Sequence, residues 1–599
     1  MGVRYAEFLG KFYLRPAARG TFRAKKRAGV TNADLTSIAL IGTSSNGNYF
    51  NNTALTMDER IMEFSSFEDA YSILGDGDLS DAVKACFPPS RDTRFTAPQA
   101  VRVLCVSDNT AASATAAANY VGVTHTVSAA IPGNKGNALR FKFASSGTVI
   151  SYGDSKAMTT TQPIDADTMS IQYTGNGTTA VIEVDSVSLK TTITGQSDGS
   201  LSLNISFTDY KTIGDLAEYL NAQIGYSATV IASPDSPCER LDHILAAEAV
   251  SILTAQTLTS LFYYQKVVLE STEAFNITAG TSNKPFADSV SFVYLAGGAE
   301  GTAATQDYLD AIDFLKASKY SGFFVNALTT NTSVGARLAD YAMYGNSPEG
   351  SSEKFTGWGL DTTLSFSARI DLCKAVNSEY MAVGGVPVKM LRADGVTEKT
   401  FPGWMLAVIH NAIKASANMR ETPTYKDLAI LDAPEVLSDV QIDKALAAGM
   451  LVVDRKPNKG AFKITRALTS YQNQNLILNE SSICCTALAM VKYLREQLEA
   501  NFVGEVPVDP STNDAVFTDA DIRTFVDGII KVDFIQRFGY LSRNIYTGEA
   551  AFDFNYTIQR DGDIIYFVFP DGNVVSPINF MFFLLNLDTI RGTSTGGAV

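Results

Sequence analysis

Apolar and polar positions divide the chain into parts of different texture. Residues 36–42 (TSIALIG) and 100–106 (AVRVLCV) are short apolar runs with many β-branched side chains, which is typical of buried strands. Between them, Ser65 or Ser66 precedes acidic residues as a helix N-cap would, and residues 78–87 predict a second short helix. This order of strand, helix, helix and strand indicates an α/β domain.

The same alternation returns after residue 290. We expect strands over 292–295, 322–326 and 380–383, and helices over 308–317, 401–419 and 438–448. The helix at 401–419 has Pro402 at its start and carries apolar side chains at helical spacing. Residues 33–111 and 291–450 are therefore interpreted as one discontinuous core domain around a mixed sheet.

The segment between these two parts has a β-rich pattern. Apolar positions alternate with polar ones at 181–185 (VIEVD) and 201–207 (LSLNISF), and turn residues separate the runs. Such short alternating runs predict a β-sandwich or barrel. A helix is expected at 213–224, and residues 241–265 are expected to be more helical. We interpret residues 112–290 as an insertion into the core.

Residues 451–599 form the last predicted unit. We expect strands at 450–453 and 461–465, helices at 479–501 and 519–531, and further strands from about 546 to the end. Two aromatic-rich apolar runs flank a predicted Pro-Asp-Gly-Asn turn at 570–573. The second run, 578–587, must be buried or paired, because an exposed apolar edge strand aggregates. It can join its own sheet, or it can be lent to a neighbouring chain.

The first 30 residues differ from the rest. Eight Lys or Arg residues stand against a single acid, Glu7, and aromatic residues are interleaved among them: Tyr5, Phe8, Phe12, Tyr13 and Phe22. This segment is either a solvated terminus or an arm that docks on an acidic surface, such as another copy of this chain. Aromatic residues among basic ones also suit nucleic acid, but nothing else in the sequence supports that partner.

Composition narrows the class of protein. A chain of 599 residues is expected to hold two to four domains, and 46% apolar with 19% charged residues is a globular composition. The net charge of −15 argues against a nucleic-acid-binding surface over the whole chain. Six cysteines without CxxC spacing are expected to be buried apolar side chains. We find no secretory h-region and no membrane-spanning run, so we expect synthesis in the cytoplasm.

The sequence contains none of the common catalytic or cofactor motifs. It lacks GxxxxGK[ST], HExxH, GxSxG and the DxDxDG calcium loop. The glycines at 297, 298 and 301 follow a strand, but without a lysine they predict a turn and not a phosphate loop. The histidines lie in different segments: His125, His243 and His410. We therefore predict no catalytic residues, no cofactor and no metal.

An ordered set of short segments resembles the contractile phage tail sheath proteins. The segments are 39–43 (ALIGT), 64–67 (FSSF), 81–87 (DAVKACF), 101–103 (VRV), 131–139 (IPGNKGNAL), 295–301 (LAGGAEG) with 307–308 (DY), 401–404 (FPGW), 418–423 (NMRETP), 446–450 (LAAGM), 463–471 (KITRALTSY) and 501–504 (NFVG). The resemblance covers residues 33 to 590. It departs from the family pattern where a Pro-Gly-Val-Tyr is usual near the start and where residues 404–417 replace an Ala-rich segment.

The resemblance implies an α+β and α/β multidomain fold. Residues 1–32 would be an N-terminal arm, 33–111 with 291–450 the mixed-sheet core, 112–290 the outer β-rich insertion, and 451–599 a C-terminal domain that faces an inner tube. Terminal strands would be exchanged between neighbouring chains. The residues expected in this exchange are Tyr5, Phe8, Phe12, Tyr13, Ile578, Phe580, Phe582 and Leu584. Contacts to the tube or a neighbour are expected at Lys531, Arg537 and Arg543, unless these side chains form a solvated face.

The resemblance also implies a function without catalysis. The chain would be a sheath subunit that polymerises as stacked hexameric rings around a tube, and contraction would drive the tube through the host envelope for genome ejection. Expected partners are further copies, the tail tube protein, and baseplate and tail terminator proteins, without nucleic acid or membrane insertion. The protein would assemble in the host bacterial cytoplasm and reside in the virion. The alternative is a static lattice protein of the capsid or surface-layer type.

Overall fold

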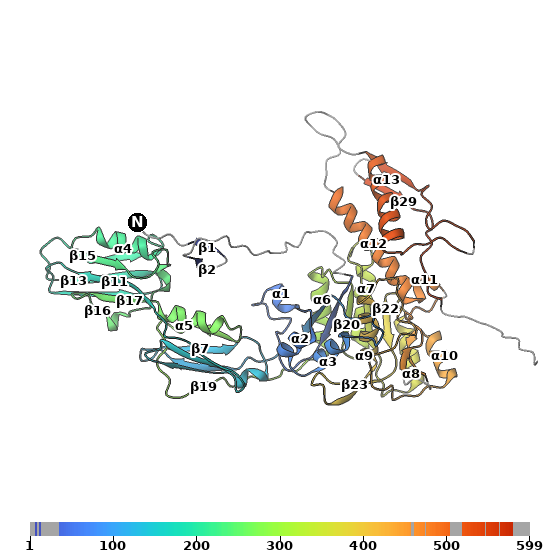
Figure 1. Ribbon diagram of the computed structural model, residues 1–599, viewed down its shortest axis with the longest axis horizontal. Helices are drawn as coiled ribbons and strands as arrows, with labels where there is room; N and C mark the ends of the chain where they lie inside the picture. Colours follow the sequence, from blue (N-terminus) through green and yellow to red (C-terminus); the bar gives the residue numbers. More distant parts are fainter. Residues whose placement is uncertain are drawn as a thin grey trace, which may run out of the picture. The chain divides into compact units, whose positions relative to one another are not determined.

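The computed structural model describes residues 6–8, 11–13, 35–456, 461–473, 475–503, 518–545, 547–561 and 564–578 (Figure 1). The chain divides into two compact units. The larger unit consists of Leu35–Leu488 with Val574–Val599, and the smaller one of Ala489–Asn573 with Met1–Asp34. Several separate sheets and helices of both α/β and β-rich type make up these units, as the sequence predicted.

A seven-stranded sheet forms the centre of the larger unit. Its strands, in spatial order, are β25 (Met450–Leu451), β22 (Met381–Gly384), β21 (Phe355–Gly359), β20 (Phe324–Ala327), β3 (Ser37–Gly42), β5 (Ala100–Cys105) and β4 (Met62–Phe64). All neighbours are parallel except β4 and β5. Strands that precede the insertion and strands that follow it meet in this one sheet, where β20 pairs with β3, and the strands expected at 36–42 and 100–106 are confirmed.

Helices cover both faces of this sheet. They are α2 (Phe67–Leu74), α3 (Asp78–Cys86), α6 (Thr305–Ala317), α7 (Thr332–Gly345), α8 (Phe366–Val376), α9 (Gly403–Ala415) and α10 (Asp439–Ala447), while the short α1 (Met57–Arg60) precedes β4. Helices α6 and α7 lie on one side, and α3 and α9 on the other (Figure 1). Right-handed crossovers that leave a central strand in opposite directions place their helices on opposite faces, which explains this arrangement.

The helix starts follow local chemistry that the sequence displays. The hydroxyl of Ser66 accepts from the backbone N–H of Asp69, and the predicted N-cap is thereby confirmed. The sequence did not predict α7, β21 or α8, although Asn331 and Ser365 are good caps. Strand β21 reads FTGWG, and its two glycines give it a turn-like composition.

The insertion has two hydrophobic cores, each with its own sheets. The first contains β6 (Ser113–Ala117), β7 (Thr124–Ala129), β8 (Arg140–Ala144), β9 (Val149–Gly153), β10 (Met158–Thr160), α5 (Leu261–Glu270), β18 (Phe275–Thr278) and β19 (Val293–Tyr294). The second contains β11 (Asp167–Tyr173), β12 (Thr179–Val184), β13 (Ser188–Thr194), β14 (Asn204–Ser206), α4 (Ile213–Asn221), β15 (Tyr226–Val230), β16 (Val250–Ser251) and β17 (Gln256–Thr259). Residues 241–265 are therefore mostly not helical, contrary to expectation, because the alternating QTLT of β17 pairs with β11.

The chain leaves the larger unit through further short strands and a long helix. A hairpin of β23 (Val388–Leu391) and β24 (Glu398–Phe401) precedes α9, and β26 (Val453–Lys456) pairs with β27 (Ala461–Ile464). After α11 (Leu476–Asn479), helix α12 (Ser481–Asn501) runs from the larger unit into the smaller one. The predicted helix at 479–501 is confirmed.

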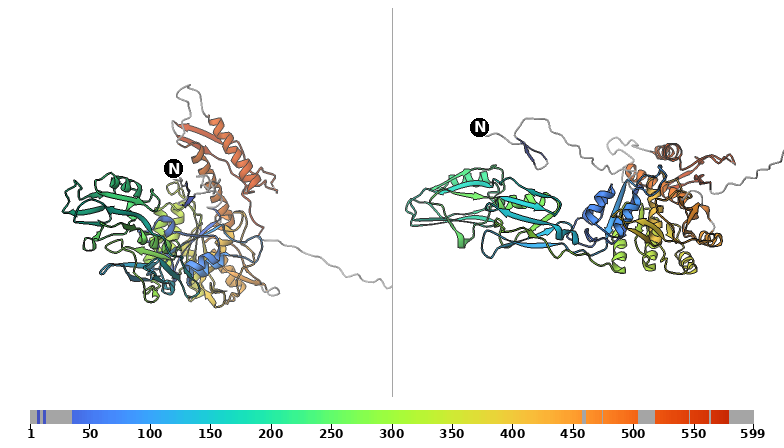
Figure 2. Two further views of the ribbon diagram at one scale, coloured as in Figure 1. Left: turned by 60° about the vertical axis from the view of Figure 1, so that its left-hand side comes forward. Right: turned by 60° about the horizontal axis from the view of Figure 1, so that its bottom comes forward.

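The smaller unit combines helices with a hairpin. Helix α13 (Asp519–Gly528) continues without a break as the π-helix η4 (Ile529–Arg537), so the helix expected at 519–531 is confirmed and extended. It lies beside the C-terminal part of α12 (Figure 2), where the ring of Tyr493 packs on those of Phe534 and Phe538 at 5.9 and 5.5 Å between ring centres. Strands β28 (Thr557–Asp561) and β29 (Ile564–Val568) form an antiparallel hairpin.

The predicted turn at 570–573 is wrong. These residues are extended, and Gly572 forms an isolated antiparallel bridge with Phe552. The backbone N–H of Asn573 donates to the carbonyl of Ala551 at 3.0 Å, and its own carbonyl accepts from Ser542 at 3.0 Å. Pairing with an upstream segment therefore overrides the local turn propensity of Pro-Asp-Gly. The apolar run at 578–587 lies outside the described residues except for Ile578.

Helix α9 is buried along its whole length and carries a polar network. The ring of His410 lies 2.9 Å from the hydroxyl of Ser481 and 2.9 Å from the side-chain oxygen of Asn411. The side-chain N–H of Asn411 donates to the side-chain oxygen of Asn326 at 2.9 Å. The ammonium of Lys414 donates to the carbonyls of Met419 and Glu421. Because buried polar groups destabilise a fold unless they are paired, this network fixes α9 against the sheet and the start of α12.

Close backbone contacts position the start of α9. A Cβ added to Gly384, at the end of β22, would come within 2.0 Å of the carbonyl oxygen of Gly403, and one added to Gly359 would come within 1.7 Å of the backbone nitrogen of Trp404. These glycines let the helix approach the strand ends at a distance that no side chain permits. The core is therefore closely packed where α9 meets the ends of β21 and β22.

We expect Gly384→Ala to destabilise the larger unit by about 3 kcal/mol, because the added methyl group must displace the start of α9. Chemical denaturation followed by far-ultraviolet circular dichroism measures this change. Gly528→Ala is the matched control, since a Cβ there meets nothing within 4 Å, and it should be neutral or slightly stabilising. Equal stability of Gly384→Ala and the wild type would contradict the close packing.

Burial lowers the pKa of His410 to about 4. The folded-state pKa lies below that of the unfolded chain, so the unfolded state takes up the proton first as the pH falls. The stabilising effect of the neutral ring is complete above about pH 6.5 and is lost toward pH 4, at a cost of about 3 kcal/mol. Unfolding titrations over this range should show a smaller pH dependence for His410→Gln than for the wild type; identical slopes would refute a buried neutral ring.

Candidate strand-pairing surface

Strands β28 and β29 form a two-stranded sheet that joins no other sheet among the described residues. Their register runs from Thr557 opposite Val568 to Asp561 opposite Ile564. Neither outer edge of this hairpin pairs with another strand among the described residues. An isolated two-stranded hairpin is marginally stable in water, and an unpaired edge offers a row of N–H and C=O groups to a further strand.

Apolar side chains lie next to these open edges. Tyr566 and Val568 are 50% and 56% exposed and, being two residues apart, share one face of β29. On the following residue, Phe569, the ring packs against Tyr556 at 5.0 Å and Phe567 at 5.6 Å between ring centres. The hairpin is thus fixed on an aromatic cluster while part of its apolar surface stays in solvent. Exposed apolar surface beside an open strand edge is typical of a protein–protein contact.

A polar contact set anchors the hairpin to α13. The hydroxyl of Tyr556 donates to the carboxylate of Asp527 at 2.9 Å, and the guanidinium of Arg523 donates to the carbonyl of Tyr556 at 2.6 Å. The same guanidinium lies 4.5 Å from the centre of the Tyr556 ring. Burial, and then the hydrogen bond to Asp527, raises the pKa of Tyr556, so its hydroxyl stays a donor. The hairpin is therefore held at its base, next to the first residue of β28.

The N-terminal segment carries a second hairpin. Strands β1 (Ala6–Phe8) and β2 (Lys11–Tyr13) pair in antiparallel register, with Ala6 opposite Tyr13. This places Phe8, Phe12 and Tyr13, three of the residues predicted for strand exchange, on strands. The two strands form their own sheet without a third strand among the described residues.

Of the other predicted exchange residues, only Ile578 lies in the described part of the chain. Ile578 is 79% exposed at the end of the described chain. The remaining four lie outside the described residues: Tyr5, Phe580, Phe582 and Leu584. Their role in strand exchange stays a prediction.

The three basic residues predicted to contact a tube or a neighbour make local contacts. The ammonium of Lys531 lies 4.5 Å from the centre of the Phe554 ring. Arg537 is 3.5 Å from the carboxylate of Asp533, with its side chain 63% exposed. Arg543 donates to the carbonyl of Gly548 at 3.3 Å. Their role in contacts to other proteins stays a prediction.

Sequence reasoning missed the residues that shape this surface. It expected strands from about 546 to the end, but it named no partner for the IIYFV segment. The actual partner, β28, reads TIQRD, and it begins with two adjacent β-branched residues but is otherwise polar. Tyr566, Val568 and the anchor formed by Arg523, Asp527 and Tyr556 were not singled out.

Neither a metal-binding cluster nor a membrane-spanning helix is present among the described residues. No group of three or more His, Cys, Asp or Glu side chains within them is arranged to hold a metal ion. None of the helices built from them combines the length and apolarity that a membrane span needs.

Comparison with known proteins places the chain among its relatives. No protein-family model matches it. The tail sheath protein of Bacillus phage SP01 is 25% identical over 536 residues, which cover 84% of this chain and 87% of the relative.

Solved structures give a second comparison. The sheath tail protein of Listeria innocua has the same fold, with a TM-score of 0.50 and 13% identity over 87% of this chain and 88% of that one. A sheath tail protein of Desulfitobacterium hafniense matches 91% of this chain and 93% of its own, with a TM-score of 0.48 and 11% identity. The sequence likeness to the phage protein extends over most of both chains, so this chain is a homologue of a phage tail sheath protein.

Proposed function

We propose that this chain is the structural subunit of a contractile tail sheath. It polymerises as stacked hexameric rings around an inner tube, and its contraction drives the tube through the host envelope. The observation that carries the proposal is the open-edged β28–β29 hairpin, which lies in a chain homologous to a tail sheath protein. The tail tube, baseplate and tail terminator proteins are its partners in the virion, and assembly takes place in the host cytoplasm.

Strand addition links the subunits in this proposal. A strand from a neighbouring copy extends the β28–β29 sheet through main-chain hydrogen bonds, and the exposed Tyr566 and Val568 contribute apolar contacts. The β1–β2 hairpin and the apolar run after residue 578 are the segments that neighbours supply or receive. The main-chain hydrogen bonds of the added strand persist while the subunits that the strand joins change their orientation.

Contraction then requires no chemistry in the chain. The larger unit, with its close glycine contacts and buried α9, moves as a rigid body. Two lattice packings of such bodies differ in interface area and charge complementarity. A signal from the baseplate converts the less stable packing to the more stable one. The insertion forms the outer surface of the polymer and the C-terminal domain faces the tube.

Removal of residues 1–28, or of residues 578–599, should leave a soluble, folded monomer that does not polymerise. Each truncation deletes one partner of the exchanged sheet but removes none of the buried residues in the described part of the chain, which lie between Leu35 and Tyr556. Sedimentation velocity and electron microscopy of the purified variants measure the outcome. Polymers of normal appearance from both truncated proteins would rule out strand exchange as the link between subunits.

A double substitution tests the hairpin itself. Tyr566→Lys with Val568→Lys should change the free energy of unfolding by less than about 0.5 kcal/mol for each exposed site but should abolish polymerisation, because charges replace the apolar contact to the added strand. Light scattering against protein concentration gives the readout.

The matched control is Val121→Lys with Val396→Lys, at valines that are 95% and 82% exposed in the larger unit. These substitutions add the same charge and should leave polymerisation unchanged. If the hairpin variant polymerised as readily as this control, β29 would not be the contact.

A further inference from the structure

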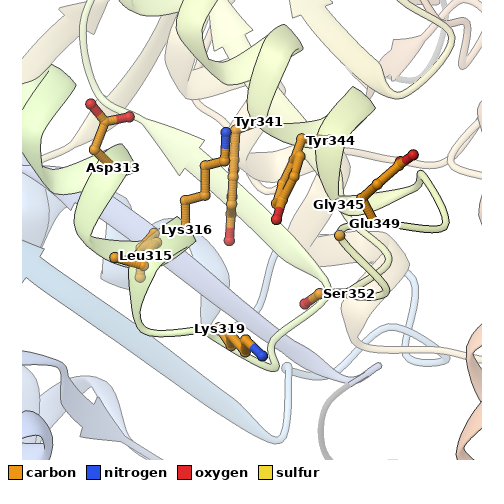
Figure 3. Close-up of a pocket in the computed structure, with 11 residues that line it drawn as sticks. Asp313, Leu315, Lys316, Lys319, Tyr341, Tyr344, Gly345, Glu349 and Ser352 are labelled. Atoms are coloured by element: carbon orange, nitrogen blue, oxygen red, sulfur yellow. The ribbon is translucent and has the colours of Figure 1, made fainter.

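A cavity of about 410 Å³ lies between α6, α7 and the loop that follows α7. Its walls combine basic, aromatic and small polar side chains, and Figure 3 shows Lys316, Lys319, Tyr341, Tyr344 and Ser352 around it. Nothing in the proposed strand pairing uses this cavity, which lies wholly within the larger unit.

One buried polar group faces the cavity without a partner. Tyr341 is 4% exposed, and its hydroxyl has no hydrogen-bond partner among the described residues. The rings of Tyr341 and Tyr344 stand side by side, and both hydroxyl groups point toward the side where Ser352 and Lys319 lie (Figure 3). Burial raises the pKa of Tyr341, so its hydroxyl remains protonated and can donate. A buried donor without an acceptor is destabilising, so an acceptor placed in the cavity would stabilise this site.

The charged groups around the cavity favour an anionic acceptor. The ammonium of Lys316 lies 4.0 Å from the centre of the Tyr344 ring, and among the described residues neither it nor Lys319 forms an ion pair. The acids of the lining already have partners. Asp313 lies 3.4 Å from the guanidinium of Arg337, and hydrogen bonds to its own backbone and to Ser347 lower the pKa of Glu349. Two ammonium groups and a hydroxyl donor therefore remain for a ligand.

A carboxylate is the ligand that fits these donors. It accepts up to four hydrogen bonds and pairs with ammonium groups. The chain itself is a rich source, since it has 63 Asp and Glu residues against 48 Lys and Arg.

We propose that the cavity between α6 and α7 receives an Asp or Glu side chain from a second copy of this chain. The proposal rests on the proposed function, because it names a contact between subunits of the polymer. The carboxylate accepts from the hydroxyl of Tyr341 and pairs with Lys316 or Lys319. This contact joins larger units directly and is separate from the strand pairing of the smaller ones.

Tyr341→Phe removes the donor with little change of shape. Because the hydroxyl is unpartnered in the single chain, we expect the unfolding midpoint of the monomer to stay the same or to rise. The protein concentration needed for polymerisation should increase about tenfold, as for the loss of one charge-assisted hydrogen bond. Polymerisation at the wild-type concentration would overturn the proposal.

Two further variants keep this test decisive. Tyr226→Phe is the matched control, since the hydroxyl of Tyr226 bonds to Thr191 at 2.6 Å and to the carbonyl of Leu201 at 2.8 Å, and its loss should lower the unfolding midpoint. Should Tyr341→Phe fail to fold, Lys316→Gln with Lys319→Gln, at two exposed positions, should raise the polymerisation concentration at least as much.

Zero-length cross-linking locates the contact. A carbodiimide joins a lysine amine to a touching carboxylate as an amide, and the water lost converts the reagent to its urea. Polymers of the full chain made from mixed ¹⁴N- and ¹⁵N-labelled copies should give peptides that link Lys316 or Lys319 of one copy to an acidic peptide of the other. Cross-links between copies that spare both lysines would overturn this inference alone, whereas no cross-links between copies at all would contradict the proposed function as well.

Discussion

Backbone hydrogen bonding at strand edges is the constraint on which this account depends. The smaller unit presents a two-stranded hairpin, and the N-terminal segment presents another, without a third strand for either among the described residues. Each open edge carries donors and acceptors that a third strand would pair. Beside one edge, Tyr566 and Val568 are exposed apolar side chains, and their burial would favour contact with another chain. Open edges of this kind can receive a strand from another chain, as the proposed sheath requires.

The larger unit has the opposite character. Its parallel sheet is covered on both faces, and α9 is buried at every residue. The glycine contacts at Gly384 and Gly403 and the polar network of His410, Asn411 and Lys414 leave little freedom for internal rearrangement. In the proposed polymer, bodies packed in this way would keep their shape, and the added strands that join them would tolerate a change of orientation.

Part of this fold was readable from the sequence. The strand at β3, the cap at Ser66 and the helix at α3 follow local rules that neighbouring residues determine. Strand β21 was missed because its glycines have a tertiary cause. A Cβ at Gly357 would approach the side chain of Asn326 to 2.1 Å, a contact between residues far apart in the chain. Likewise, the IIYFV strand was recognised by its apolar residues, but its partner β28 was not. The unpartnered hydroxyl of Tyr341 results from the packing of α6 on α7, which no local pattern encodes.

Negative-stain electron microscopy of the purified full-length protein, alone and with its tube protein, tests the central claim most directly. A sheath subunit is expected to form hollow, cross-striated cylinders, which require both subunit linkage and a tube-sized lumen. Flat sheets or closed shells would instead establish a static lattice protein. Discrete particles at high concentration, even with the tube protein present, would contradict the claim that open strand edges join these chains into a sheath.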